Sequence, residues 1–340
     1  MGKKVTIREV AAECGLSVSA VSQVLNGKEI GIPQKTKEKV RAAAEKLRYC
    51  PNSAARSLVT SRSDTVGVLV PDISNAFFGE SFKEIQRRMG EEGFDVLLCS
   101  GDGTAKQDER FLRLFAARGA DGLIVAPAAE TLEEKNAEKF AALLEEIRIP
   151  YVYLDRYPAL PCVRVSADHR AGGYAAARCL LKNGHTKIGC IAGPAALVGA
   201  RLRLEGFCDA LAEAGIRPLA INAPFTAEGG ERAAKALFGR GLTALFASDD
   251  LQAYGAMRAA AETGVRIPDD VSLVGYDDLQ FSALANPPLT TISQPVKDMA
   301  AAAAELLLRR MRGEDAENPP LFVPRLIERQ TVKNLKEEIE

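Results

Sequence analysis

A polar stretch near the N-terminus, residues 6–27, has the pattern of two short helices joined by a tight turn. Thr6 and Glu9 have the Thr-x-x-Glu spacing of a capping box, in which a hydroxyl and a carboxylate satisfy free amides at a helix start. Gly15 suits the turn because glycine adopts positive φ without steric cost, and Ser17 is a favourable N-cap for the second helix. Apolar residues at helical spacing predict a small shared core: Ile7, Val10, Ala11, Leu16, Val21 and Leu25.

Charge is divided unevenly along the chain. Residues 1–62 contain 12 Lys and Arg against 5 Asp and Glu, whereas the rest of the chain contains 32 basic and 40 acidic residues. An ordinary helical hairpin is the alternative explanation of the first segment, but a hairpin has no need of this excess of positive charge. A small basic module joined to a larger acidic one is typical of proteins that bind the phosphate backbone of DNA.

From residue 65 onward, short apolar runs alternate with helical stretches. The expected strands are 65–70, 95–99, 122–126, 151–154, 187–192, 218–223, 242–247 and 271–275. The expected helices are near 77–92, 106–117, 137–147, 169–182, 200–214, 228–238 and 250–263. This alternation predicts an α/β fold with parallel sheets covered by helices on both faces. Two groups of four strands favour two similar lobes over one large sheet.

Ligands of such folds bind outside the carboxyl ends of the strands. Aromatic and charged residues follow several strands: Phe77, Phe78, Asp155, Arg156, Asp249, Asp250, Tyr276, Asp277 and Asp278. We expect Phe77 to form a wall of a cleft and Phe78 to lie in a lobe core. Any one of these aspartates could instead be a helix N-cap, and we expect that role for Asp250. The residues that surround Arg203 in the sequence, taken alone, predict that it is an exposed charge on a helix.

Little in the sequence indicates an enzyme, a metal site or a membrane protein. The seven cysteines are scattered and form no Cys-x-x-Cys pair, so neither a disulfide framework nor a metal site is expected. The two histidines, His169 and His185, accompany no nucleotide-binding or nucleophile motif, and no cofactor is expected. We expect His185 to serve a turn or a cap. No signal peptide and no apolar run of about 18 residues is present, which favours a cytoplasmic protein.

Ordered motifs over most of the chain resemble the LacI/GalR family of bacterial repressors. They are the helix-turn-helix and residues 35–40, 49–58, 67–78, 184–188, 268–278 and 287–295. The resemblance implies an N-terminal all-α helix-turn-helix headpiece and two Rossmann-like lobes of the periplasmic-binding-protein type. The lobes would be joined by three crossings near residues 164, 293 and 324. A secreted sugar-binding protein would share the lobes, but it would need an export signal and would lack residues 1–60.

The resemblance also implies a domain plan. Residues 1–50 would be the DNA-binding domain, 51–62 a hinge helix and linker, and 63–340 the effector-binding domain. Lobe 1 would comprise about 63–163 and 295–323, and lobe 2 about 164–292 and 324–340. A hinge helix at 52–60 is too short to be stable alone, so it should form only when two copies meet on DNA.

The DNA-binding residues implied by the resemblance are Thr6, Ser17, Val18, Ser19, Ser22, Gln23, Asn26, Arg56 and Leu58. Val18, Ser19 and Gln23 would face the bases, since glutamine pairs bidentately with adenine and valine can meet a thymine methyl group. Thr6, Ser17, Ser22 and Asn26 are better suited to phosphates. Leu58 would insert into the central minor-groove step and kink the DNA.

The effector-binding residues implied by the resemblance are Phe77, Asp155, Arg156, Arg203, Phe225, Asp249 and Asp277. In this interpretation Arg203 clamps the ligand, Asp277 accepts hydrogen bonds from its hydroxyls and Phe225 stacks on it. Such groups suit a polyol, and similarity to the ribose repressor branch favours ribose or another small sugar. A purine-dependent corepressor system is the alternative. Leu197 and Gly199, however, stand where purine repressors are expected to place polar groups.

The expected protein is therefore a non-enzymatic regulator, a repressor by family resemblance, that binds a palindromic operator as a homodimer. A small-molecule effector would shift the lobes between two arrangements and so change operator affinity. Whether the effector releases DNA or promotes its binding is left open by the sequence. The tail 333–340 has only Leu335 and Ile339 at helical spacing, too few for a coiled coil, which predicts a dimer and not a tetramer.

Overall fold

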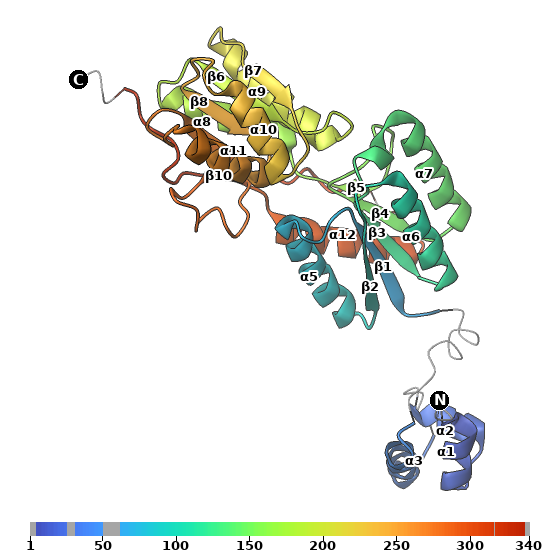
Figure 1. Ribbon diagram of the computed structural model, residues 1–340. Coiled ribbons are helices and arrows are strands. Elements are labelled where there is room, and N and C mark those ends of the chain that lie inside the picture. The colour runs from blue at the N-terminus through green and yellow to red at the C-terminus, as the bar shows by residue number, and fades with distance from the viewer. Residues whose placement is uncertain (1–4, 26–30, 50–61, 316, 337–340) are drawn as a thin grey trace. The chain divides into compact units, whose positions relative to one another are not determined.

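The computed structural model describes residues 5–25, 31–49, 62–315 and 317–336. The chain forms two compact units, residues 1–63 and 64–340, and each is considered by itself (Figure 1). Asn26, Arg56 and Leu58, and the whole of the expected hinge helix at 52–60, lie outside the described residues.

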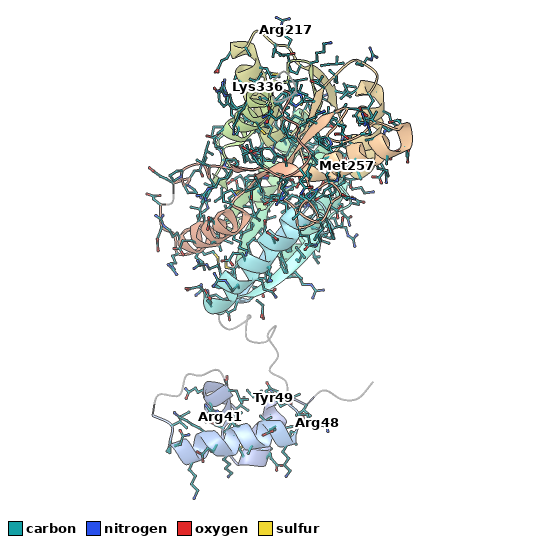
Figure 2. The ribbon with its side chains drawn as sticks, turned by 90° about the vertical axis from the view of Figure 1, so that its left-hand side faces the viewer. Arg41, Arg48, Tyr49, Arg217, Met257 and Lys336 are labelled. Carbon is teal, nitrogen blue, oxygen red and sulfur yellow. The ribbon has the colours of Figure 1, made fainter. Side chains whose placement is uncertain are left out.

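The described residues of the first unit form the helices α1 (Ile7–Cys14), α2 (Val18–Leu25) and α3 (Gln34–Lys46). The predicted capping box is confirmed, because the Thr6 backbone N–H donates to the Glu9 carboxylate at 2.6 Å. Gly15 has φ 63°, and the Ser17 hydroxyl oxygen accepts from the Ala20 N–H at 3.2 Å. The helix-turn-helix is thus confirmed, and a core that includes Val10 and Val21 holds it together. Figure 2 shows side chains from α3 and the residues that follow it, including Arg41, Arg48 and Tyr49.

One half of the second unit, called lobe 1, is built on a parallel sheet of order β2-β1-β3-β4-β5. Its strands are β1 (Thr65–Val70), β2 (Asp95–Ser100), β3 (Gly122–Val125), β4 (Tyr151–Leu154) and β5 (Arg164–Val165). Helices α5 (Ala76–Glu91) and α12 (Val296–Met311) cover one face, while α6 (Ala105–Ala117) and α7 (Glu134–Ile147) cover the other (Figure 1). A 3-10 turn, η1 (Glu130–Leu132), precedes α7. Burial on both faces explains why the strands are almost wholly apolar.

The other half, called lobe 2, has a sheet of order β11-β10-β9-β8-β6-β7, parallel except for β11. Its strands are β6 (Ile188–Ala192), β7 (Leu219–Asn222), β8 (Ala244–Ala247), β9 (Ser272–Asp277), β10 (Thr290–Ser293) and β11 (Arg325–Ile327). Helices α8 (His169–Lys182) and α9 (Val198–Glu213) cover one face. Helices α10 (Ala227–Leu237) and α11 (Asp250–Thr263) cover the other.

All eight predicted strands are present, with ends that differ by at most two residues from those expected. The sequence patterns missed β5, β10 and β11, which contain two, four and three residues. These strands lie where the chain passes between the lobes, and a parallel bridge between Ala167 and Phe322 joins two of the crossing segments. Runs this short carry no recognisable period.

Two glycines allow α8 and α9 to pack closely. A Cβ on Gly173 would lie 1.9 Å from the backbone oxygen of Arg203, and one on Gly206 would lie 1.9 Å from that of Arg170. Only glycine permits two helix backbones to approach to this distance. The pair places His169, at the start of α8, beside Arg203 of α9.

Candidate functional site

The predicted base-reading residues lie on the exposed face of α2. Val18 is 41% exposed, and Ser19 and Gln23 are also exposed, while Val21 and Val24 are buried on the opposite face. Thr6 and Ser17 are exposed but serve as helix caps, and Ser22 is half-buried. The face that α2 presents to solvent is therefore the one that carries the expected base contacts.

Arg203 is buried in lobe 2, with 4% of its surface exposed. Its Nη1 donates to the backbone oxygen of Ser248 at 2.6 Å and lies 3.4 Å from Asp277 Oδ1. Its guanidinium lies over the Tyr276 ring, 3.8 Å from the centroid, and 5.6 Å from the centroid of Phe225. The expectation of an exposed helix charge is wrong. The residue is held by the carboxyl ends of β8 and β9, where the fold places ligands.

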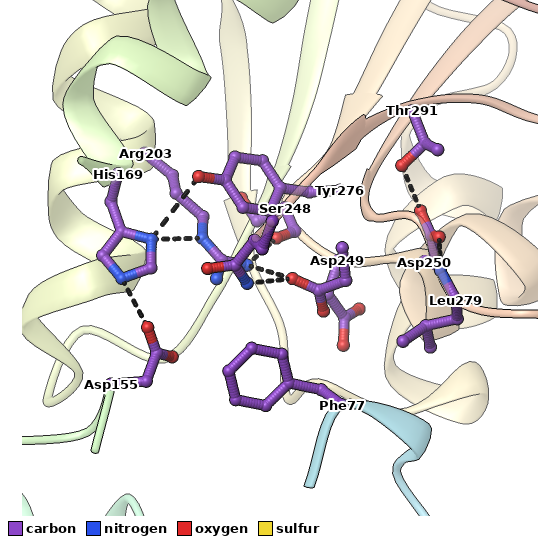
Figure 3. Close-up of polar contacts among 12 residues, drawn as sticks. Phe77, Asp155, His169, Arg203, Ser248, Asp249, Asp250, Tyr276, Leu279 and Thr291 are labelled. Atoms are coloured by element: carbon purple, nitrogen blue, oxygen red, sulfur yellow. Dashed lines mark hydrogen bonds and ion pairs between the residues drawn. The ribbon is translucent and has the colours of Figure 1, made fainter. Parts of the chain in front are cut away.

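His169 joins the two lobes. Its Nε2 lies 3.0 Å from Oδ1 of Asp155, which follows β4 in lobe 1, and its Nδ1 accepts from Arg203 Nε at 3.2 Å. Because Nδ1 accepts, the ring proton is assigned to Nε2, which faces the Asp155 carboxylate. Figure 3 shows the imidazole between Asp155 and Arg203, with Phe77 on the same side as Asp155.

Two of the aspartates predicted for the cleft have strained backbone. Asp277, the last residue of β9, has φ 110°, and Asp155 has φ 62°. Positive φ costs a non-glycine residue of the order of 1–3 kcal/mol and is concentrated at functional sites. The Asp277 carboxylate is only 7% exposed and accepts from Gln294 Nε2 at 2.6 Å. The surrounding structure holds both residues in this conformation, with their carboxylates at the strand ends.

The adjacent residues Asp249 and Asp250 have different roles. Asp249 caps α11, because its Oδ1 accepts from the Gln252 N–H at 2.8 Å. Asp250 instead accepts from the Thr291 hydroxyl at 2.6 Å, from the Leu279 N–H at 2.8 Å and from the Ser282 hydroxyl. The expectation that Asp250 is the cap is therefore wrong. The helix begins at Asp250, one residue earlier than that assignment required, and the pattern could not tell which aspartate precedes it.

The carboxyl groups of the cleft have shifted pKa values. Burial raises the pKa of Asp277, although Arg203 opposes the shift, and burial holds that of Asp249 well above its usual value. Burial, assisted by the charge of Asp277, raises the pKa of Asp250 to about 7. Burial alone would also raise the pKa of Asp155, but His169, Arg203 and Arg156 together keep it below its usual value.

Some buried oxygen atoms at the cleft have no hydrogen-bond partner among the described residues. They include Asp249 Oδ2, Gln252 Oε1 and Gln294 Oε1. Buried polar atoms are nearly always paired in native proteins, so unpaired acceptors at strand ends are candidate contacts for a ligand that donates hydrogen bonds. The sequence patterns did not identify either glutamine or His169 as a residue of the site. They also did not show that the Tyr276 ring packs against the Arg203 guanidinium.

Aromatic residues line both lobes near these groups. Phe77 and Phe78 are 4% and 2% exposed and meet edge to face at 5.1 Å in the first turn of α5. Both rings belong to the same hydrophobic core, which was predicted for Phe78 but not for Phe77, and the Arg156 guanidinium lies 5.1 Å from the ring centroid of Phe78. Phe225 of lobe 2 is half-buried, and a Cβ on Gly193 would lie 2.3 Å from its ring.

His185, the second histidine, is buried away from these residues. Its ring contacts the Thr243 hydroxyl at 3.0 Å and the backbone oxygen of Lys333 at 3.1 Å, so it fixes the turn that precedes β6. Within the described part of the chain, no group of His, Cys, Asp or Glu could hold a metal ion. None of the described helices has the length and hydropathy needed to cross a membrane.

Two family models match the chain. Residues 6–52 match "Bacterial regulatory proteins, lacI family", and residues 177–332 match "Periplasmic binding protein-like domain". The chain is 37% identical to the HTH-type transcriptional regulator DegA of Bacillus subtilis, and the similarity covers 98% of this chain and 99% of that protein. It is 33% identical to the repressor PurR of Photobacterium profundum, over 97% and 99% of the two chains. It is also 33% identical to the ribose operon repressor of Halalkalibacterium halodurans, over 96% and 97%.

Solved structures agree with these relatives. The lac repressor dimer bound to operator and the anti-inducer ONPF has a TM-score of 0.87 at 30% identity, over 97% of this chain and 100% of that one. A regulator from Enterococcus faecium with bound ribose has a TM-score of 0.71 at 29% identity, over 80% and 99%. The headpiece and the two lobes thus define a DNA-binding transcriptional regulator with a periplasmic-binding-protein-like domain. The chain belongs to the lacI family of bacterial regulatory proteins.

Proposed function

We propose that this protein represses transcription in the bacterial cytoplasm by binding a palindromic operator as a homodimer. Its operator affinity is controlled by a small sugar, with ribose as the first candidate, bound between lobes 1 and 2. The observation that carries the proposal is the buried pair of Arg203 and Asp277, flanked by Phe225 and by unpaired acceptor atoms. An arginine fork, a carboxylate and flat rings are the groups that bind the hydroxyls and the apolar face of a sugar.

The relatives support both a sugar and a purine as effector, and the cleft favours the sugar. The ribose operon repressor and the ribose-bound regulator support ribose, while PurR supports the alternative. Leu197 is apolar and 4% exposed, and a Cβ on Gly199 would lie 2.8 Å from the His169 ring. Neither position offers a side chain that could hydrogen-bond to a purine.

The proposed control is a population shift between open and closed lobes. Arg203, Asp249 and Asp277 are at most 7% exposed, so a ligand enters only when the lobes separate. Separation breaks the contact of His169 with Asp155, which spans the lobes. A ligand that replaces this contact changes the preferred lobe angle.

The proposed DNA complex uses the domain plan expected from the sequence. The headpiece, residues 1–50, reads the bases through Val18, Ser19 and Gln23, and the segment 51–62 forms a hinge helix on DNA. The lac repressor dimer on its operator supports this arrangement. Light scattering should give two subunits in dilute solution without DNA, and four would contradict the dimer.

Calorimetry on three proteins tests the effector site. Removal of Arg203 or Asp277 leaves the other charge buried and unpaired, so Arg203→Ala and Asp277→Ala should each weaken sugar binding by roughly 2–5 kcal/mol. Arg170→Ala is the matched control, because Arg170 forms an exposed ion pair with Asp209 on the same two helices and should leave affinity unchanged. Tight binding of a purine with no heat from sugars would overturn the sugar assignment. If Arg203→Ala and Asp277→Ala both bound the sugar as tightly as the wild type does, the assignment of these residues would be overturned.

A further inference from the structure

Arg156 is a cleft arginine whose guanidinium forms no ion pair or hydrogen bond within the described residues, although its charge acts at longer range on Asp155, Asp249 and Asp277. It follows β4 in lobe 1 and is half-buried, and its guanidinium lies over the ring of Phe78 at 5.1 Å. Phe78 follows β1, and β1 and β4 both pair with β3, so the two residues share the carboxyl edge of the lobe-1 sheet. The ring of Phe78 packs against the guanidinium of Arg156, while the guanidinium N–H groups make no hydrogen bond to a described side chain or backbone oxygen.

The carboxylates that act electrostatically on Arg156 are those of Asp155, Asp249, Asp277 and Asp108. Asp155 contacts His169, and Asp277 contacts Arg203 and accepts from Gln294. Asp249 caps α11, and burial holds its pKa well above the usual value. Among the described residues, no carboxylate oxygen lies within 4.0 Å of a guanidinium nitrogen of Arg156, so this arginine forms no ion pair. Five N–H donors therefore remain for a ligand.

We infer that the effector carries an acidic group, a carboxylate or a phosphate, in addition to its hydroxyls, and that Arg156 binds this group on the lobe-1 side of the cleft. The inference rests on the proposed function, since it concerns the same ligand. A planar guanidinium held over a ring binds a carboxylate or a phosphate through two parallel N–H bonds. Because the hydroxyl-binding residues Arg203 and Asp277 are in lobe 2, such a ligand contacts both lobes at once and stabilises their closure.

The test compares neutral sugars with their acidic counterparts by calorimetry on the full-length protein. The ligands are ribose, ribonate and ribose 5-phosphate, and also glucose, gluconate and glucose 6-phosphate. The proteins are the wild type, Arg156→Gln and the matched control Arg164→Gln. Arg164 is also a lobe-1 arginine over an aromatic ring, 4.7 Å from the centroid of Tyr157, but it is not part of the proposed site.

An acidic member should bind the wild type about 10- to 100-fold more tightly than its neutral parent, as charge-assisted hydrogen bonds imply. Arg156→Gln should abolish this preference, and Arg164→Gln should retain it. The tighter of the two acidic forms identifies carboxylate or phosphate.

Three outcomes would overturn the inference. Equal affinity for neutral and acidic forms would refute it while the proposed function stands. A preference that survives in Arg156→Gln would show that another group binds the acid. Binding of a purine, with none by any sugar or sugar acid, would refute the proposed sugar effector and this inference together.

Discussion

At the scale of single residues, the cleft contains acidic side chains that differ in protonation and in role. Asp155 and Asp277 have left-handed backbone and face basic partners, whereas Asp250 is buried among hydroxyl groups and a backbone amide. Asp250 connects α11 to the loop after β9 and to β10. It therefore holds in place the backbone from which Asp277 projects.

Asp250 should make stability depend on pH. Its folded-state pKa of about 7 exceeds the usual 3.8, so the unfolded chain loses this proton first as pH rises. The native state is therefore favoured below about pH 4 and loses this contribution between about pH 4 and 7, by up to roughly 1.4 kcal/mol per pH unit. In urea unfolding between pH 4 and 7, Asp250→Asn should show a shallower fall in unfolding free energy than the wild type. Parallel curves would contradict the shifted pKa.

The sequence predicted part of this site, for physical reasons. Asp155, Arg156, Asp249 and Asp277 were found because they follow strands, and parallel strands bring such residues to one edge. Arg203 was assigned only from family resemblance, since nothing local distinguishes it from an exposed helix charge. His169 was missed because it begins a helix and follows no predicted strand, and its contact with Asp155 depends on how the two lobes meet.

At the scale of elements, the α8–α9 pair determines where Arg203 lies. Gly173→Ala should destabilise the protein by about 1–3 kcal/mol, since its Cβ would overlap the backbone oxygen of Arg203. It should also weaken effector binding, because α9 must move. Gly90→Ala is the control: Gly90 lies inside α5 with open space around it, and alanine there should be neutral or stabilise by up to about 1 kcal/mol. Thermal unfolding measures the stability of both variants, and calorimetry measures their affinity for the effector. If Gly173→Ala and Gly90→Ala behaved alike, the close packing of α8 and α9 would not determine where Arg203 lies.

Helix α2 is the element expected to determine which operator sequence the protein prefers. Gln23→Ala should weaken binding to the preferred palindrome by roughly 1–3 kcal/mol and relax the preference at one base pair of each half-site. Gln34→Ala, which removes an exposed glutamine at the start of α3, should change neither. Fluorescence anisotropy on a panel of operator variants makes the comparison. Uniform weakening by Gln23→Ala on all sequences would mean that Gln23 contacts only phosphate.

Helices and long strands were predictable at this scale, and short strands were not. The eight predicted strands are apolar runs bounded by helices, whereas β5, β10 and β11 are short segments that are recognised as strands only by their pairing with β4, β9 and β10. The same limit applied at the start of α11, where two adjacent aspartates gave two equivalent caps and only the fold selected Asp249.

At the scale of the whole molecule, a basic N-terminal unit is joined to an acidic unit with two lobes. Regulation of the proposed kind requires that these units communicate: the effector alters the lobe angle, and the lobe angle alters operator binding. Thermodynamic linkage then makes the effect reciprocal, so the factor by which effector changes operator affinity equals the factor by which operator changes effector affinity.

The most direct test measures both factors on one preparation. Operator affinity is measured by anisotropy with and without saturating effector, and effector affinity by calorimetry with and without saturating operator. The account predicts that the two factors are equal and lie between about 5- and 150-fold, the usual range of allosteric coupling. An effector that binds through Arg203 and Asp277 but leaves operator affinity unchanged would contradict it.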